Sequence, residues 1–152
     1  MAGGAAWAVA VLWLGPALAS PRPPSEAVAT ALLPPGLVPA AMIGRLAARR
    51  FVDPALIDGG PTAGADRRVL TDTVEQVVLA PCTRPAPAAA FGTRGPVAVV
   101  AMGRAFPASR IIFWAGYQAS PALRAFGFAA TFYTTVLAGS CAPRLLLPAP
   151  TP

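Results

Sequence analysis

Two cysteines have the clearest potential chemistry in this chain, because a pair of thiols can be oxidised to a disulfide. Cys82 and Cys141 are the only cysteines among the 152 residues. A bond between them would close a loop of about sixty residues and stabilise the fold by roughly 4 kcal/mol, through the entropy lost by the unfolded chain. We expect this internal pairing if the chain is exported to an oxidising compartment. The alternative is a bond from one or both cysteines to another chain.

Groups for catalysis are otherwise scarce. The chain has no histidine, which excludes Ser-His-Asp and Cys-His catalytic sites and histidine-bound metals. Its glycines match neither the dinucleotide-binding nor the P-loop spacing. Nothing in the sequence singles out a pair among the six acidic residues. We therefore expect a protein that is not an enzyme, with no catalytic residue, metal site or cofactor. The acids are Glu26, Asp53, Asp58, Asp66, Asp72 and Glu75.

The basic residues are all arginine, and their distribution is uneven. The chain has a net charge of +6, and all of this excess lies after residue 75, where no acid opposes the arginines. These arginines are separated by apolar segments and form no cluster, which argues against binding to nucleic acid. The pattern favours an acidic protein partner or arginines that are simply solvated. The unopposed arginines are Arg84, Arg94, Arg104, Arg110, Arg124 and Arg144.

The first 19 residues have the pattern of a secretory signal peptide. An uncharged apolar stretch at 5–14 is followed by Gly15-Pro16 and by small residues at 17 and 19. This pattern predicts cleavage between Ala19 and Ser20. The longest later apolar run, 125–139, is shorter than the roughly twenty residues that cross a bilayer. We therefore expect an exported chain that reaches a membrane only through a partner, and whose cysteines meet an oxidising compartment.

The remaining sequence predicts short elements separated by loops. Proline is frequent in 20–38, which indicates a flexible N-terminus, and the apolar spacing in 39–51 indicates a helix. Segment 71–82 is ambiguous, and we favour a turn that leads into a strand. The β-branched and aromatic runs at 97–102 and 110–114 predict two antiparallel strands. Ser120 and Pro121 are a typical helix start, and apolar residues then recur every three or four positions as far as Gly139.

These elements predict an α+β fold. We expect a small single domain with a short antiparallel sheet, two or three helices and long Pro/Gly-rich loops. The predicted organisation is a signal peptide at 1–19, a flexible segment at 20–38, the domain at 39–141 and a Pro-rich tail at 142–152. An apolar strand is the expected partner interface, formed by Ile111, Ile112, Phe113 and Trp114, and the alternative is the neighbouring run 97–102.

The order of these features resembles alphaherpesvirus envelope glycoprotein L. Four pieces carry the resemblance: the aliphatic run 77–82 that ends in Pro81-Cys82, the stretch 99–107, the run 111–114 that ends in Trp114, and the Gly-Ser-Cys at 139–141. The chain departs from the family at Phe106-Pro107, where members usually have Cys-Pro, and at its Pro-rich end, where members often have a further cysteine. The usual two-disulfide scheme is therefore absent, and the family gives no direct support for pairing Cys82 with Cys141.

The resemblance implies a non-catalytic accessory subunit. Members of the family form a heterodimer with the ectodomain of glycoprotein H, assist its folding and transport, and support membrane fusion by glycoprotein B during entry. The implied location is the secretory pathway, then the virion envelope and the outer face of the host cell. The alternative function is a small exported bacterial protein, with a binding or structural role, from a GC-rich genome.

Overall fold

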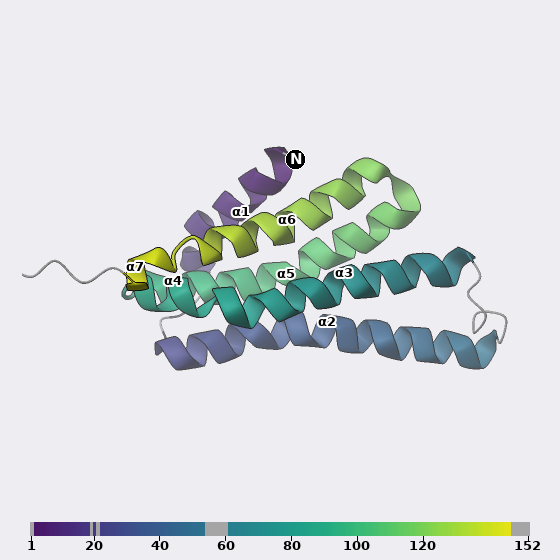
Figure 1. The fold of residues 1–152 in the computed structure, drawn as a ribbon, viewed down its shortest axis with the longest axis horizontal. Helices are drawn as coiled ribbons and strands as arrows, with labels where there is room; N and C mark the ends of the chain where they lie inside the picture. Colours follow the sequence, from purple (N-terminus) through teal and green to yellow (C-terminus); the bar gives the residue numbers. More distant parts are fainter. Residues whose placement is uncertain (1, 19, 21, 54–60, 147–152) are drawn as a thin grey trace, which may run out of the picture.

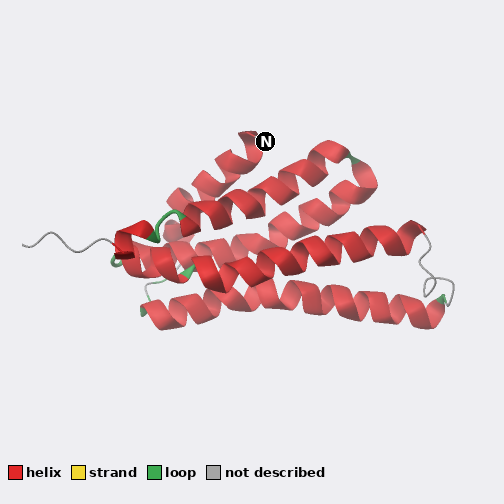
Figure 2. Ribbon diagram, viewed as in Figure 1, coloured by secondary structure: helices red, strands yellow, loops and turns green. Residues whose placement is uncertain are grey.

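The part of the chain that can be described is almost all helical. The structure, a computed structural model, describes residues 2–18, 20, 22–53 and 61–146. The helices are α1 (Ala2–Leu14), the 3-10 turn η1 (Gly15–Leu18), α2 (Pro24–Val52), α3 (Pro61–Thr83), α4 (Pro85–Ala90), α5 (Arg94–Ala119), α6 (Pro121–Gly139) and α7 (Pro143–Leu146). No strand occurs among these residues (Figure 2). The predicted α+β fold with an antiparallel sheet is wrong, and the protein is a helical bundle.

The predicted strands lie within two long helices. Residues 71–82 belong to α3, and both 97–102 and 110–114 belong to α5. Residues 95–103 are all buried. A short apolar run that is buried on every side has no alternation to distinguish a strand from a helix, so residue type alone was misleading. Helix α5 satisfies its backbone groups internally, and the apolar run then packs against helices on several sides.

Helix α2 includes most of the segment that was expected to be flexible. It begins at Pro24, where proline fits the first turn because the missing N–H has no partner there anyway. Pro34, Pro35 and Pro39 lie inside the helix and remove backbone donors. Ala27, Ala31 and Pro35 recur every fourth residue and are buried, so one face of α2 packs tightly despite the prolines. Residues 39–51, predicted as a helix, form the second half of α2.

The helix predicted at the end of the domain is confirmed. Helix α6 begins at Pro121, its Ser120 hydroxyl accepts a hydrogen bond from the Leu123 N–H, and the helix ends at Gly139. Its buried face differs from the expected apolar stripe. Of the five stripe residues only Ala130 is buried, and the other buried positions are mainly small or hydroxyl-bearing. The five stripe residues are Leu123, Phe126, Ala130, Tyr133 and Leu137.

Helix α5 is the central element of the bundle. It packs against α2 on one side and α6 on the other, and α3 lies alongside α2 (Figure 1). Helix α1 packs on α6 and α5, with Trp7 edge-on to Phe126 at a ring-centroid distance of 6.3 Å. The chain connects α5 to α6 through a single residue, Ser120, so these two helices form an antiparallel hairpin.

The helices approach one another through small residues. A Cβ atom on Gly103 would lie 2.5 Å from the backbone oxygen of Ala31, and one on Gly127 would lie 2.4 Å from the backbone nitrogen of Phe113. Many large apolar side chains instead face outward from the same helices, a distribution opposite to that of a typical soluble domain. The outward residues include Leu33, Leu37 and Ile43 on α2 and Leu123, Phe128, Phe132, Val136 and Leu137 on α6.

Candidate functional site: an apolar groove and a buried arginine cavity

The two cysteines lie where the ends of α3 and α6 meet. Thr83 follows Cys82, and its Cγ2 lies 3.5 Å from the position of a Cβ on Gly139, two residues before Cys141. Both thiols are unpaired in the structure, and each donates to a carbonyl of its own helix, Cys82 to Val78 and Cys141 to Leu137. The topology brings the two segments together, and the disulfide between them stays a prediction.

If Cys82 and Cys141 are bonded to each other, replacing Cys82 with serine is expected to lower the yield of folded protein, because the loss of a bond across about sixty residues costs roughly 4 kcal/mol. Cys141→Ser should lower the yield equally, since each change removes the same bond. Mass analysis without reductant checks the pairing directly. Two free thiols, or a covalent link to another chain, would contradict the internal bond.

The predicted interface residues separate around the surface of α5. Ile111 is 64% exposed, whereas Phe113 is 2% exposed and packs against Gly127 of α6. Ile112 and Trp114 are half-buried. A strand would have placed alternate residues on one face, but a helix turns successive residues about its axis. Phe113 therefore belongs to the core and is not available to a partner, while Ile111 and Trp114 line the same groove.

This groove lies between α2 and α5 and has a volume of about 310 Å³. We call it the α2–α5 groove. Most of its lining is aliphatic or aromatic, and its charged residues are Arg45, Asp66 and Arg110. Such a cavity, mostly apolar with a few polar groups, is the usual form of a small-molecule site. Its apolar lining residues are Val38, Ala41, Met42, Leu46, Pro107, Ile111 and Trp114.

A carboxylate fixes one end of the groove. Asp66 of α3 is buried, and its Oδ2 accepts from Arg49 Nη1 at 2.7 Å while its Oδ1 accepts from Trp114 Nε1 at 3.0 Å. The Arg45 guanidinium lies over the Trp114 ring, 4.8 Å from its centroid. Asp66 thereby joins α2, α3 and α5 and holds the Trp114 side chain in place.

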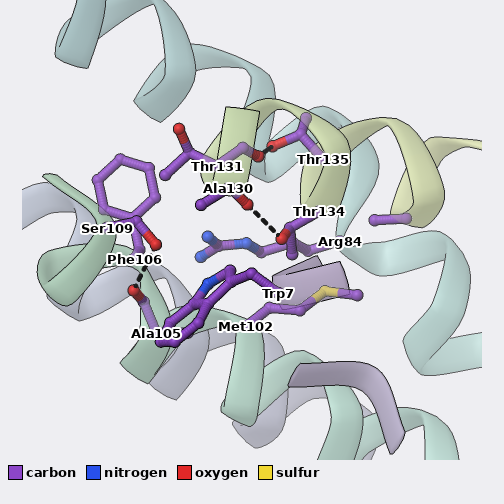
Figure 3. A pocket seen from close by; sticks show the side chains of 11 residues that line it. Trp7, Arg84, Met102, Ala105, Phe106, Ser109, Ala130, Thr131, Thr134 and Thr135 are labelled. Carbon is purple, nitrogen blue, oxygen red and sulfur yellow. Dashed lines mark hydrogen bonds between the residues drawn. The ribbon is translucent and has the colours of Figure 1, made fainter. Parts of the chain in front are cut away.

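A second cavity lies in the core, near a buried arginine (Figure 3). Its volume is about 10 Å³, close to the space that one water molecule needs. Arg84 is 5% exposed, and its Nη1 donates to the backbone oxygen of Ala31. Burial lowers the pKa of Arg84 to about 10, so the guanidinium remains protonated at neutral pH. The Phe106 ring lies between Arg84 and Arg110, at 5.9 and 5.7 Å from their guanidinium carbons.

The hydroxyl groups around this cavity are already engaged as donors. Ser109 donates to Ala105, and Thr134 donates to Ala130, in each case one helical turn back (Figure 3). Their oxygens can only accept further hydrogen bonds, and acceptors suit a cation or a bridging water better than an anion. The cavity therefore offers hydrogen-bond acceptors beside the buried Arg84 guanidinium.

Sequence reasoning missed the polar groups that organise the core. Asp66, Arg84 and Arg110 were noted only for their charge, and the structure buries all three. A usable indication was present for Arg110, which directly precedes the run Ile111-Ile112-Phe113-Trp114. An arginine beside an apolar run with no polar alternation is a candidate for burial. Nothing local marked Asp66, whose partners lie 17 and 48 residues away along the chain.

The region around the predicted signal cleavage site is only partly described. Ala19 lies outside the described residues, and Ser20 is exposed. Helix α1, which cleavage would remove, packs closely on the bundle: Ala8 is buried, and a Cβ on Gly4 would lie 2.4 Å from that of Ala129. Trp7 also lines the small core cavity beside Arg84. Cleavage would therefore open both this cavity and the α5–α6 surface beneath α1.

The described residues contain no group of three or more His, Cys, Asp or Glu side chains that could hold a metal ion. Comparison with known proteins found no matching family model, no curated relative and no solved structure of similar fold.

Proposed function

We propose that this chain is a non-catalytic accessory subunit that functions by packing its apolar helix faces against a larger partner protein. The observation that carries the proposal is the set of large apolar side chains that are exposed on α2 and α6, although both helices contact α5 closely through small residues. Large exposed apolar faces are typical of surfaces that are covered in the working state. Permanent partners bury such faces in large, hydrophobic interfaces.

The partner that follows from the order of sequence features is a glycoprotein H ectodomain, with glycoprotein B acting downstream in membrane fusion. The N-terminal pattern of a signal peptide supports entry into the secretory pathway, and the resemblance to glycoprotein L extends the proposal to the virion envelope and the host cell surface. Segments 71–82, 97–102 and 110–114 are helical, so the predicted strands give the proposal no support. The proposal rests on the order of the sequence motifs and on the exposed apolar faces. An exported bacterial binding protein would use the same apolar faces with a different partner.

Co-expression with a tagged glycoprotein H ectodomain tests this function. The two chains are expected to co-purify, and the exported yield of the ectodomain should rise when this chain is present. Replacing both Leu33 and Leu37 with serine should weaken recovery of the complex at least about tenfold, since each buried leucine contributes about 1.5–3 kcal/mol. Ala48→Ser, also on the exposed surface of α2, is the matched control and should have no effect. A chain that is exported well alone, stays monomeric and never co-purifies would overturn the proposal.

A second candidate is a bundle embedded in a lipid bilayer. Three helical stretches are long and apolar enough to cross a membrane by length and composition: Pro24–Val52, Arg94–Ala119 and Pro121–Leu145. Close helix contacts through Gly and Ala are also common between helices in membranes. Extraction of membranes with alkaline carbonate separates the two candidates. Release into the soluble fraction supports the accessory subunit, and retention in the pellet supports the embedded bundle.

A further inference from the structure

We propose that the α2–α5 groove binds a single-chain carboxylate, a medium-chain or long-chain fatty acid, with the aliphatic chain in the apolar trough and the carboxylate at Arg45. This site is separate from the outward faces of α2 and α6 that the accessory-subunit proposal uses. Two observations on the groove support it: its size and apolar lining, and the half-exposed guanidinium of Arg45, whose ion pair with Asp66 is loose.

The groove has the size and lining that an aliphatic chain needs. Its volume of about 310 Å³ lies at the lower end of the range of about 300–1,000 Å³ for small-molecule sites. Met42 and Leu46 of α2 line it together with Pro107 and Ile111 of α5. An aliphatic chain placed there leaves water and gains about 0.8 kcal/mol for each buried methylene group. A polar or highly charged ligand would find few partners along this lining.

The charge at one end of the groove selects an anionic head group. Asp66 is the only acid among the described residues that line the groove, and both of its oxygens already accept hydrogen bonds, from Arg49 and from Trp114. The Nε of Arg45 lies 3.9 Å from Asp66 Oδ2, which is beyond hydrogen-bond distance. The Arg45 side chain is half-exposed, with its guanidinium carbon 4.8 Å from the centroid of the Trp114 ring, so part of the guanidinium remains open to a ligand. A carboxylate matches a guanidinium in a two-point contact.

Arg110 also lines the groove, but its guanidinium faces α6, where it lies over the Phe113 ring at 4.6 Å. It is 2% exposed, its Nη2 donates to Thr131 Oγ1, and its Nε and Nη1 have no hydrogen-bond partner among the described residues. A buried guanidinium with unpartnered N–H groups is costly unless an anion lies nearby. Asp72 acts as such an anion for Arg110, so the positive charge that complements a carboxylate in the groove is that of the half-exposed Arg45.

Quenching of Trp114 fluorescence by a brominated fatty acid tests the site directly, because bromine quenches an indole only at close range. Titration of the full chain with a brominated dodecanoate is expected to quench part of the tryptophan emission in a saturable way. Trp114→Phe should remove that saturable component, and in a chain that keeps residues 1–19 the emission of Trp7 and Trp13 should remain unquenched. Quenching that persists in Trp114→Phe would place the acid elsewhere and overturn the proposal.

Charge variants test the head group. Arg45→Gln should weaken binding of dodecanoate about tenfold or more, because a charge-assisted hydrogen bond contributes about 1.5–3 kcal/mol. Arg50→Gln, in the same last turns of α2 but outside the groove lining, is the matched control and should bind normally. Dodecanol should bind the unaltered chain about as weakly as dodecanoate binds Arg45→Gln. Equal affinity for the alcohol and the acid in the unaltered chain would overturn the proposal.

A third variant tests the apolar part of the groove. A comparison with lipid vesicles distinguishes a free fatty acid from a membrane lipid as the ligand. Ile111→Glu places a carboxylate at the groove from a position that is already exposed, so the fold should persist, as circular dichroism can verify, while dodecanoate binding is lost. Vesicles of phosphatidylglycerol provide the same anionic and aliphatic chemistry in a bilayer. The proposal expects saturable binding of the monomeric acid without vesicles. Binding to vesicles alone would overturn it.

Discussion

Gly127→Ala is expected to destabilise the protein by about 2–4 kcal/mol, although it adds only one methyl group. A Cβ at position 127 would lie 2.4 Å from the backbone nitrogen of Phe113 and 2.6 Å from its Cα. Neither atom can rotate away, so α6 has to move from α5 and weaken the contact between these two helices. Overpacking costs typically about 1–3 kcal/mol, and the larger value here follows from the rigid backbone neighbour.

Gly44→Ala is the matched control, since the same methyl group is added where no atom lies within 4 Å. Alanine at this exposed position in α2 should stabilise the protein by about 0.5–1 kcal/mol, because glycine loses more backbone entropy when a helix forms. Urea unfolding followed by circular dichroism measures both changes in the free energy of unfolding. Opposite signs support the close packing of α5 on α6. A neutral Gly127→Ala would show that the two helices are further apart than described.

Asp66→Ala is also expected to have a large effect and to lower the free energy of unfolding by about 2–4 kcal/mol. The change removes the acceptor for Arg49 Nη1 at 2.7 Å and for Trp114 Nε1 at 3.0 Å. Removal of one partner from a buried charged pair leaves the other uncompensated, at a cost of about 3–5 kcal/mol when both are buried. Arg49 is partly exposed, so water recovers some of this cost.

Asp66→Asn and Glu75→Ala show whether charge or packing is responsible. Asparagine still offers an oxygen to Trp114 but loses the charge, so its cost should be about half that of alanine. Glu75 is an exposed acid on the same helix, and its replacement by alanine should change stability by less than about 0.5 kcal/mol. Urea unfolding gives the three energies, and Trp114 fluorescence reports the loosened indole. Equal effects of Asp66→Ala and Glu75→Ala would contradict the structural role of Asp66.

The helix ends of the bundle were predictable where a local rule governs them. Ser120 followed by Pro121 marks the start of α6, and the Ser120 hydroxyl does cap it. Gly139 marks its end. These features depend on a few adjacent residues, because the first N–H groups of a helix need a nearby acceptor. The beginning of α2 was missed, since three internal prolines outweighed the Ala spacing that packs this helix on the bundle.

The interior was predicted less well, because burial depends on contacts between distant residues. The run at 97–102 has the β-branched side chains of a strand, but its helical form is fixed by neighbours on α2, α4 and α6. Ala31, Ala88 and Val99 form one cluster in the core, although up to 68 residues separate them along the chain. No window of sequence contains that information, and a continuous apolar run fits a buried helix as well as a buried strand.

The sequence by itself determined the chemistry that this protein lacks and the ends of one helix. An absent histidine excludes its reactions whatever the fold, and a capping serine acts on backbone groups only three residues away. Only the tertiary structure decided that the apolar runs are helices, that Phe113 is buried while Ile111 is exposed, and that Asp66 joins three helices. The physical reason is that helix identity and burial are set by packing between elements far apart in the chain. The missing histidine chemistry and the Ser120 cap are set by composition and by local hydrogen bonds.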